Sequence, residues 1–273
     1  MSASFFVSPQ ELWSRIGTAN APMILDVCRR EIYAACPGVI PTGQWRKPET
    51  YMEWIPSLPT DRPIVLACRY GHNLSQMIAA ELRQRGAQAQ VLEGGRKAWS
   101  EAGLPVVTKA TLERFAPKLP SLWVTRRRPK IDRVACPWLI RRFIDPQARI
   151  YYVDPGEVQH IADDSGAIPF DIEGVEISHE GGRCSFDTML KLFGLEGNEH
   201  LDRVALIVRG ADTARYDLAP EAAGLHAISL GLSALAGDDD HAMIERGFTV
   251  YDALFAWARH AAEERHNWPA KAA

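Results

Sequence analysis

The segment that ends at Cys68 carries the side chains best suited to nucleophilic chemistry. Its apolar run RPIVLAC (62–68) is typical of a buried strand, and a short loop with one glycine leads from it into an amphipathic helix. Backbone N–H groups and a helix N-terminus then point at one place and favour negative charge there. We therefore expect Cys68 to be held as a thiolate nucleophile. On spacing alone, a small core residue at a strand end is an equal alternative.

The loop after Cys68 is the expected anion-binding element. Arg69 and His72 bring positive charge or hydrogen-bond donors close to the cysteine. An anion held by this loop would lie beside the Cys68 sulfur. The loop comprises Arg69, Tyr70, Gly71, His72, Asn73, Leu74 and Ser75.

A second group of chemically capable side chains lies in the latter half of the chain, at junctions between expected elements. These types of side chain ligate zinc, iron or a similar ion, so a divalent metal ion is a candidate cofactor. The alternative is structural, with the two aspartates capping helices, the histidine hydrogen-bonded and the cysteine buried. No HExxH or Cys/His spacing decides between the two. The group consists of Asp132, His179, Glu180, Cys184 and Asp212.

Two charge runs are interpreted more simply. The arginines at 126–128, with those at 133, 141, 142 and 183, have the charge to bind an anion, but such a run is usually a solvated face. The acidic run DDDH (238–241) is typical of the start of a helix, where it complements the helix dipole.

Strand-like and helix-like runs alternate through the first hundred residues. Buried strands are expected at 22–27, 62–68 and 89–95, and helices after Ser8-Pro9, at 48–58, at 74–86 and around 97–99. This alternation predicts an α/β domain, a mostly parallel sheet with helices on both faces. We expect the domain to span residues 1–108.

The rest of the chain predicts an α+β domain that is rich in helices. Residues 109–120 mix charge and proline and are expected to form a linker. Strands are expected at 121–131 and 148–155, a helix at 135–145, and a hairpin at 168–182 that turns at Glu173-Gly174. Helices follow at 184–193, 199–210, 219–236 and 239–264. This second domain would span 121–265, and residues 266–273 would form a disordered tail.

Composition narrows the class of protein. The chain has 273 residues, 47% of them hydrophobic, and a net charge of −3, so no overall positive field supports nucleic-acid binding. No apolar run approaches the roughly 20 residues of a membrane helix, and no signal peptide is evident, so a cytoplasmic location is expected. Its 5 cysteines include no CxxC pair, which argues against a disulfide framework or a zinc finger.

Residues 5–107 resemble a single-domain rhodanese. The resemblance rests on Asp26-Val27 after the first strand, on Cys68-x-x-Gly71, and on an ending from Gly94-Gly95 through Trp99 to Pro105. It implies persulfide chemistry, in which Cys68 accepts a sulfane sulfur and passes it to a nucleophile. Asp26 and Arg29 would support the site.

Two departures from the rhodanese pattern separate the possible activities. Cys28 stands where the usual arginine of the first motif would be, and the loop from Cys68 to Ser75 is one residue longer than usual. Rhodanese-fold phosphatases and arsenate reductases also have longer loops, which suit a tetrahedral oxyanion. Their closing arginine is replaced here by Asn73 and Leu74, so sulfur transfer, oxyanion sensing and an inactive site all stay open.

Residues 121–265 resemble the C-terminal domain of the bacterial chromate-resistance protein B family. The matching segments are 130–143, 177–187, 208–212 and 219–225. The resemblance implies a role in chromate resistance, with a small sulfur donor or an oxyanion as partner. One hypothesis is a sulfurtransferase or thiol-based oxyanion-handling enzyme. The alternatives are a chromate-responsive sensor or transcriptional regulator, and an adaptor with an inactive rhodanese domain. The oligomeric state is not indicated.

Overall fold

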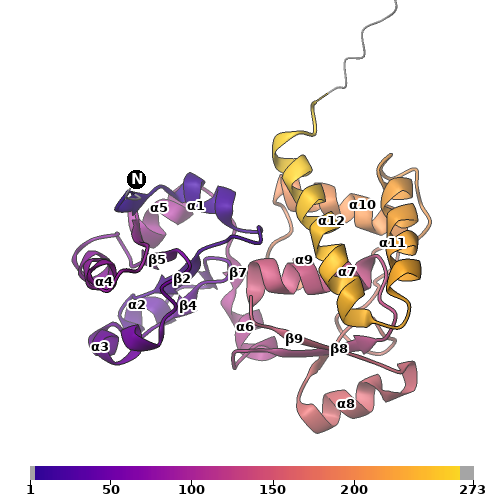
Figure 1. The fold of residues 1–273 in the computed structure, drawn as a ribbon, viewed down its shortest axis with the longest axis horizontal. Helices are drawn as coiled ribbons and strands as arrows, with labels where there is room; N and C mark the ends of the chain where they lie inside the picture. The colour runs from indigo at the N-terminus through magenta and orange to yellow at the C-terminus, as the bar shows by residue number, and fades with distance from the viewer. Residues whose placement is uncertain (1–3, 265–273) are drawn as a thin grey trace, which may run out of the picture.

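The computed structural model describes residues 4–264, which form two domains joined side by side (Figure 1). The first domain is built on a five-stranded sheet in the order β1-β6-β5-β2-β4. All four neighbouring pairs in it run parallel. The strands are β1 (Phe6–Val7), β2 (Met23–Asp26), β4 (Gln44–Trp45), β5 (Ile64–Ala67) and β6 (Ala89–Leu92).

Helices cover both faces of this sheet, as the sequence predicted. Side chains alternate along β5, so that Val65 and Ala67 face one apolar cluster and Ile64 and Leu66 face the other. The first cluster includes buried residues of α1 and α5, and the second includes buried residues of α4. The helices are α1 (Pro9–Arg15), α2 (Arg30–Ala34), α3 (Tyr51–Trp54), α4 (Asn73–Gln84) and α5 (Gly95–Glu101).

The second domain combines a small sheet with a layer of helices. Its three strands lie in the order β10-β8-β9, all parallel, and are β8 (Leu122–Arg126), β9 (Arg149–Val153) and β10 (Ile168–Pro169). α8 (Val158–Ser165) packs against β8 in an apolar cluster that includes Val124 and Val158. The remaining helices are α7 (Asp132–Leu139), which continues as a π-helix (Ile140–Ile144), α9 (Ser185–Phe193), α10 (Glu199–Asp212), α11 (Ala222–Ala236) and α12 (Asp240–His260).

The expected hairpin at 168–182 is wrong. Only Ile168–Pro169 is a strand, and it pairs parallel with β8. Asp171 follows with φ +55°, and its carboxylate accepts hydrogen bonds from Arg126 at 2.8 Å and from the Ser185 hydroxyl at 2.8 Å. This side-chain pairing draws the backbone out of the extended conformation, so the chain turns into a loop instead of a second strand.

The segment expected as a linker is largely structured. β7 (Val107–Thr108) pairs antiparallel with β3 (Gly38–Val39), and α6 (Lys109–Phe115) follows at once. From α6, Phe115 packs against Phe193 of α9, and the Thr111 hydroxyl donates to the Leu192 carbonyl at 2.6 Å. β7 and α6 therefore tie the first domain to the second (Figure 1). The expected tail, 266–273, lies outside the described residues.

A shared aromatic core fixes the two domains against each other. Trp13 of α1 lies 6.2 Å from Phe143, and Phe143 lies 5.4 Å from Phe255 of α12, measured between ring centroids. The Arg259 guanidinium sits over the Trp13 ring and donates to the Ile16 carbonyl at 2.9 Å. Along α12 four apolar residues at helical spacing are all buried: Ile244, Phe248, Tyr251 and Phe255. Within residues 4–264 no helix is long and apolar enough to cross a bilayer.

Candidate functional site

Cys68 lies where β5 ends and the loop to α4 begins. Its side chain is 9% exposed and opens into a cavity of about 390 Å³. The cavity takes most of its wall from the loop that the sequence analysis singled out, and Arg29 and Cys28 complete it from the end of β2. Its lining residues are Cys28, Arg29, Ile32, Cys68, Arg69, Tyr70, His72, Asn73, Leu74 and Met77.

The immediate partners of the Cys68 sulfur differ from those expected. The thiol points to the His72 carbonyl, 3.6 Å away, and lies 3.2 Å from the Ser75 hydroxyl. A ring of backbone N–H groups on the sulfur was predicted, but in the described chain no amide donates to it. The loop amides are nevertheless free, because none of those at 69–72 has an acceptor within residues 4–264. The loop thus carries unpaired amides, but none of them donates to the Cys68 sulfur.

The loop keeps its shape through contacts with the Gly94-Gly95 turn. The Arg96 amide donates to the Cys68 carbonyl at 2.9 Å, and the Lys97 amide donates to the Arg69 carbonyl at 3.1 Å. A Cβ on Gly95 would lie only 2.2 Å from the Cys68 carbonyl oxygen, and Gly95 has φ +61°. A glycine at position 95 is therefore required for the close approach of the two loops.

Asp26 does not reach Cys68 but contacts two residues near it, Arg96 and Cys28. Its carboxylate forms a buried ion pair with Arg96 and accepts the Cys28 amide at 2.9 Å. Arg96 donates a second hydrogen bond to the Gly38 carbonyl. Burial, and then the nearby Asp26 carboxylate, raise the pKa of Cys28 well above the usual range of a thiol. Cys28 is consequently a neutral wall of the Cys68 cavity, a position that the sequence analysis had noted only as a departure from the family motif.

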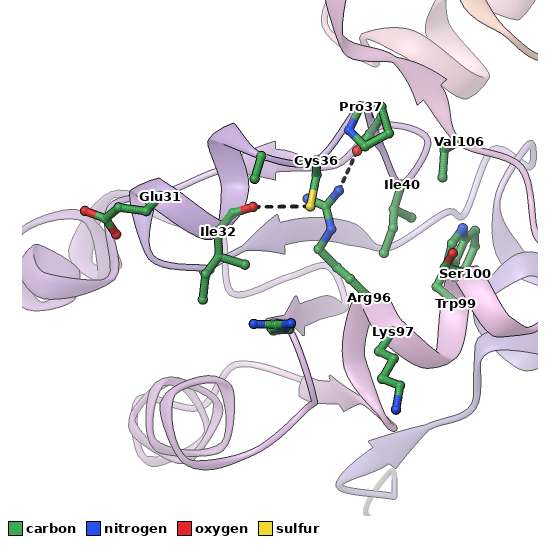
Figure 2. Close-up of a pocket in the computed structure, with 13 residues that line it drawn as sticks. Glu31, Ile32, Cys36, Pro37, Ile40, Arg96, Lys97, Trp99, Ser100 and Val106 are labelled. Carbon is green, nitrogen blue, oxygen red and sulfur yellow. Dashed lines mark hydrogen bonds between the residues drawn. The ribbon is translucent and has the colours of Figure 1, made fainter.

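A second cavity, of about 510 Å³, adjoins this loop on the side of α2 and α5 (Figure 2). Arg69 contributes to both cavities. The dashed lines in Figure 2 mark the Cys36 thiol on the Ile32 carbonyl, 3.2 Å away, and Arg96 on the Gly38 carbonyl. Arg96 is already committed to Asp26 and Gly38, so Arg69 and Lys97 are the other cationic side chains on the wall of this mostly apolar cavity.

In the second domain the structure brings together three of the five predicted ligand residues. His179 Nε2 lies 3.2 Å from Asp132 Oδ2 and 3.3 Å from Asp212 Oδ2. Asp132 begins α7, Asp212 ends α10, and His179 lies in the loop before α9. Residues far apart in the sequence therefore converge on one imidazole nitrogen.

Asp171 is the member of this cluster that sequence reasoning missed. Its Oδ1 lies 3.5 Å from His179 Nε2, while its Oδ2 pairs with Arg126 at 2.8 Å and with Arg133 at 3.2 Å. It was overlooked because residues 168–182 were interpreted as a hairpin, in which Asp171 would be an ordinary strand residue. The arginine pairing fixes one edge of its carboxylate and turns the other edge toward the histidine.

Glu180 and Cys184 lie outside the cluster. Glu180 is exposed and pairs with Lys191 at 3.1 Å. Cys184 is buried at the N-terminus of α9, where its thiol lies 3.4 Å from Asp187. Burial, and then the nearby carboxylates of Asp132 and Asp187, raise the pKa of the Cys184 thiol well above its usual value.

The crowding of carboxylates around His179 is evident in the pKa values. The hydrogen bond with Asp132 raises the pKa of His179 to about 9. Burial, and then the charge of Asp132, raise the pKa of Asp212 to about 7. Burial opposes ionisation of Asp132, but the hydrogen bond from His179 lowers its pKa below the usual value. The raised pKa of Asp212 reflects this crowding, because ionising both buried carboxylates beside a single imidazole is unfavourable.

Comparisons with known proteins agree with this two-part architecture. The profile of the rhodanese-like domain matches residues 8–102, and that of the ChrB C-terminal domain matches residues 123–258. Protein ChrB of Cupriavidus metallidurans is 38% identical over 133 residues, which are 49% of this chain. The chain covers 39% of the length of that curated relative.

Solved structures similar to this chain include a rhodanese-like domain protein from Staphylococcus aureus, 24% identical, with a TM-score of 0.32 over 35% of this chain and 91% of that one. A thiosulfate sulfurtransferase from Pseudomonas aeruginosa is 27% identical, with a TM-score of 0.31 over 38% of this chain and 19% of that one. A rhodanese homologue from Thermus thermophilus is 30% identical, with a TM-score of 0.28 over 34% of this chain and 96% of that one.

The parallel sheet, the loop after Cys68 and the matching profile define a rhodanese-fold protein with a second domain fused behind the first. That second domain belongs to the ChrB C-terminal domain family.

Proposed function

We propose that this protein is a sulfane-sulfur carrier of the rhodanese type that takes part in chromate resistance, with Cys68 as the nucleophile. The observation that carries the proposal is the position of Cys68, a cysteine at a strand end whose side chain opens into a cavity of about 390 Å³. The chromate part rests on the likeness of the second domain to ChrB.

The proposed transfer has two balanced steps. The Cys68 thiolate attacks the outer sulfur of thiosulfate, the sulfur–sulfur bond of the donor breaks, and sulfite leaves with the electron pair. This step produces a persulfide on Cys68. A nucleophile such as cyanide then attacks the terminal sulfur, leaves as thiocyanate and restores the thiolate.

The surroundings of Cys68 support binding of an anionic donor. Arg29, Arg69 and His72 line the same cavity and place positive charge or donors at its rim. The free amides of the loop can donate hydrogen bonds to a negatively charged terminal sulfur, and the N-terminus of α4 adds its dipole. The Ser75 hydroxyl, 3.2 Å from the sulfur, can donate to the thiolate.

The test is a cyanide-trapped sulfur-transfer assay on the full chain with thiosulfate as donor. Cys68→Ser is expected to reduce thiocyanate formation to the rate of a blank without protein. Cys36→Ser is the matched control, because Cys36 is a free thiol in the same domain whose sulfur bonds to the Ile32 carbonyl in the other cavity. Equal rates for wild type and Cys68→Ser would refute the proposal.

A chromate arm of the same assay tests the second part of the proposal. Chromate and thiosulfate are both tetrahedral dianions, so chromate is expected to compete for the cavity beside Cys68 and to slow thiocyanate formation in a concentration-dependent way. Sulfate, which has the same shape and charge but is not an oxidant, separates simple competition from oxidation of the thiol. No inhibition by either anion would remove oxyanion binding from the account.

A further inference from the structure

The carboxyl ends of two parallel strands meet at the cluster around His179. Asp171 follows β10, and the chain after β8 reaches Asp132 at the first position of α7. In open parallel sheets, ligands bind at this edge, where loops from neighbouring strands converge. The cluster is thus at the place in the second domain where the fold itself favours a site.

The spacing of the polar atoms fits a single ion. Oδ2 of Asp132 and Oδ2 of Asp212 lie 3.2 Å and 3.3 Å from His179 Nε2, and one ligand atom from each of the three residues lies within 4.8 Å of the others. Donors about 2.0–2.2 Å from a tetrahedral zinc ion are roughly 3.3 Å apart, as the geometry of such sites requires. The two separations from His179 Nε2 match that value.

The charge balance points the same way. Asp171 has two arginine partners, whereas His179 is the only ion-pair partner of Asp132 and of Asp212 within residues 4–264. The side chains of Asp132 and Asp212 are only 3% and 14% exposed. Two largely buried carboxylates that share one imidazole form a place where a further cation would be bound favourably, because it would offset their charge.

We propose that Asp132, His179 and Asp212 bind one divalent transition-metal ion. One imidazole with two carboxylates suits zinc, manganese or iron(II), whereas magnesium and calcium prefer oxygen ligands alone. Asp171 lies beside these three ligands. Arg126 and Arg133 hold one edge of its carboxylate, and its Oδ1 lies 3.5 Å from the same His179 nitrogen.

The site is open on one side. The His179 side chain is 44% exposed, so ligand positions on its side face solvent. Metal sites that keep such positions bind a water or an oxygen ligand there, while structural sites are closed by four protein ligands. The bound ion would therefore be accessible to small oxygen-containing molecules. This proposal does not depend on sulfur transfer at Cys68.

The test is calorimetric titration of the full chain with Zn²⁺ and, separately, with Mn²⁺ and Mg²⁺, after dialysis against EDTA and then against metal-free buffer. All variants, including the reference protein, carry Cys68→Ser so that the loop thiol does not compete for zinc. We expect one Zn²⁺ per chain, and weaker or no binding of Mg²⁺. Asp212→Asn, which keeps shape and removes charge, should weaken zinc binding by at least about 100-fold.

The matched control is Glu180→Gln, which removes an exposed carboxylate next in sequence to His179 but paired with Lys191. It should leave zinc binding unchanged. His179→Asn is the second ligand variant, and because His179 is partly exposed it should fold even if Asp212→Asn does not. Zinc binding that survives His179→Asn, or the absence of a stoichiometric zinc site in the reference protein, would overturn the proposal.

Discussion

The Gly94-Gly95 turn should be the most sensitive backbone position near Cys68. A Cβ on Gly95 would lie 2.2 Å from the Cys68 carbonyl oxygen, 2.6 Å from the Gly71 nitrogen and 2.7 Å from the Tyr70 nitrogen. All three atoms belong to the backbone of the Cys68 loop and have no flexible side chain to move aside. Gly95→Ala must therefore push this loop away from α5.

The loss of folding free energy in Gly95→Ala is the sum of two separable costs. A residue other than glycine at φ +61° costs about 1–2 kcal/mol, and overpacking of a tight contact costs about 1–3 kcal/mol more. Gly103→Ala, at the other end of α5, is the matched control. Gly103 has φ +63°, and a Cβ there would meet nothing within 4 Å. It should incur the first cost alone, so the two variants should differ by about 1–3 kcal/mol.

Urea unfolding followed by circular dichroism measures this difference. With a denaturant slope of roughly 2 kcal/mol per molar urea, the midpoint of Gly95→Ala should fall below that of Gly103→Ala by about 0.5–1.5 M. Equal midpoints would refute the reasoning, because they would mean that the Cys68 loop yields to the added methyl group at no cost.

Two further changes test contacts elsewhere in the fold. Arg209→Met removes the guanidinium that forms two hydrogen bonds with the Asp187 carboxylate, which is 4% exposed. A urea titration should show that the free energy of unfolding falls by about 2–4 kcal/mol. This is less than for a fully buried pair, because Arg209 is itself 23% exposed. A loss below about 1 kcal/mol would show the pair to be an ordinary surface interaction. Gly17→Ala places a Cβ 2.5 Å from Phe255 and 2.6 Å from Phe143 at φ +81°. The melting temperature of this variant should therefore be lower than that of the wild type. An unchanged melting temperature would contradict the tight aromatic packing between the domains.

The first domain was predictable because local signals and chemistry agree there. Ser8 accepts the Glu11 amide at 3.1 Å and caps α1, with Pro9 at its first position. Each apolar run of the sheet became a buried strand, since a parallel sheet covered on both faces leaves no polar face to confuse the pattern. Even here the hydrogen-bond partners of the Cys68 sulfur were not predictable, because no sequence pattern specifies the rotamer of a side chain or the direction of the loop amides.

In the second domain, the cluster around His179 could not be predicted from the sequence. Asp132, His179 and Asp212 meet only because α7, α10 and a loop pack together, and no spacing between them encodes that meeting. Glu180 was predicted with them from residue type alone, but it is next to His179 in sequence and points to Lys191. Asp171 was hidden by an alternating pattern that imitates a strand, although its φ of +55° breaks the extended conformation.

The most direct measurement of the central claim is the intact mass of the full chain after incubation with thiosulfate and removal of the excess. The account predicts that the wild-type protein and Cys36→Ser gain about 32 Da, the mass of one sulfur atom held as a persulfide, and that Cys68→Ser gains nothing. Cyanide should then remove the added mass. A wild-type protein that stays unmodified, or an adduct that persists in Cys68→Ser, would contradict the assignment of Cys68 as the sulfur carrier.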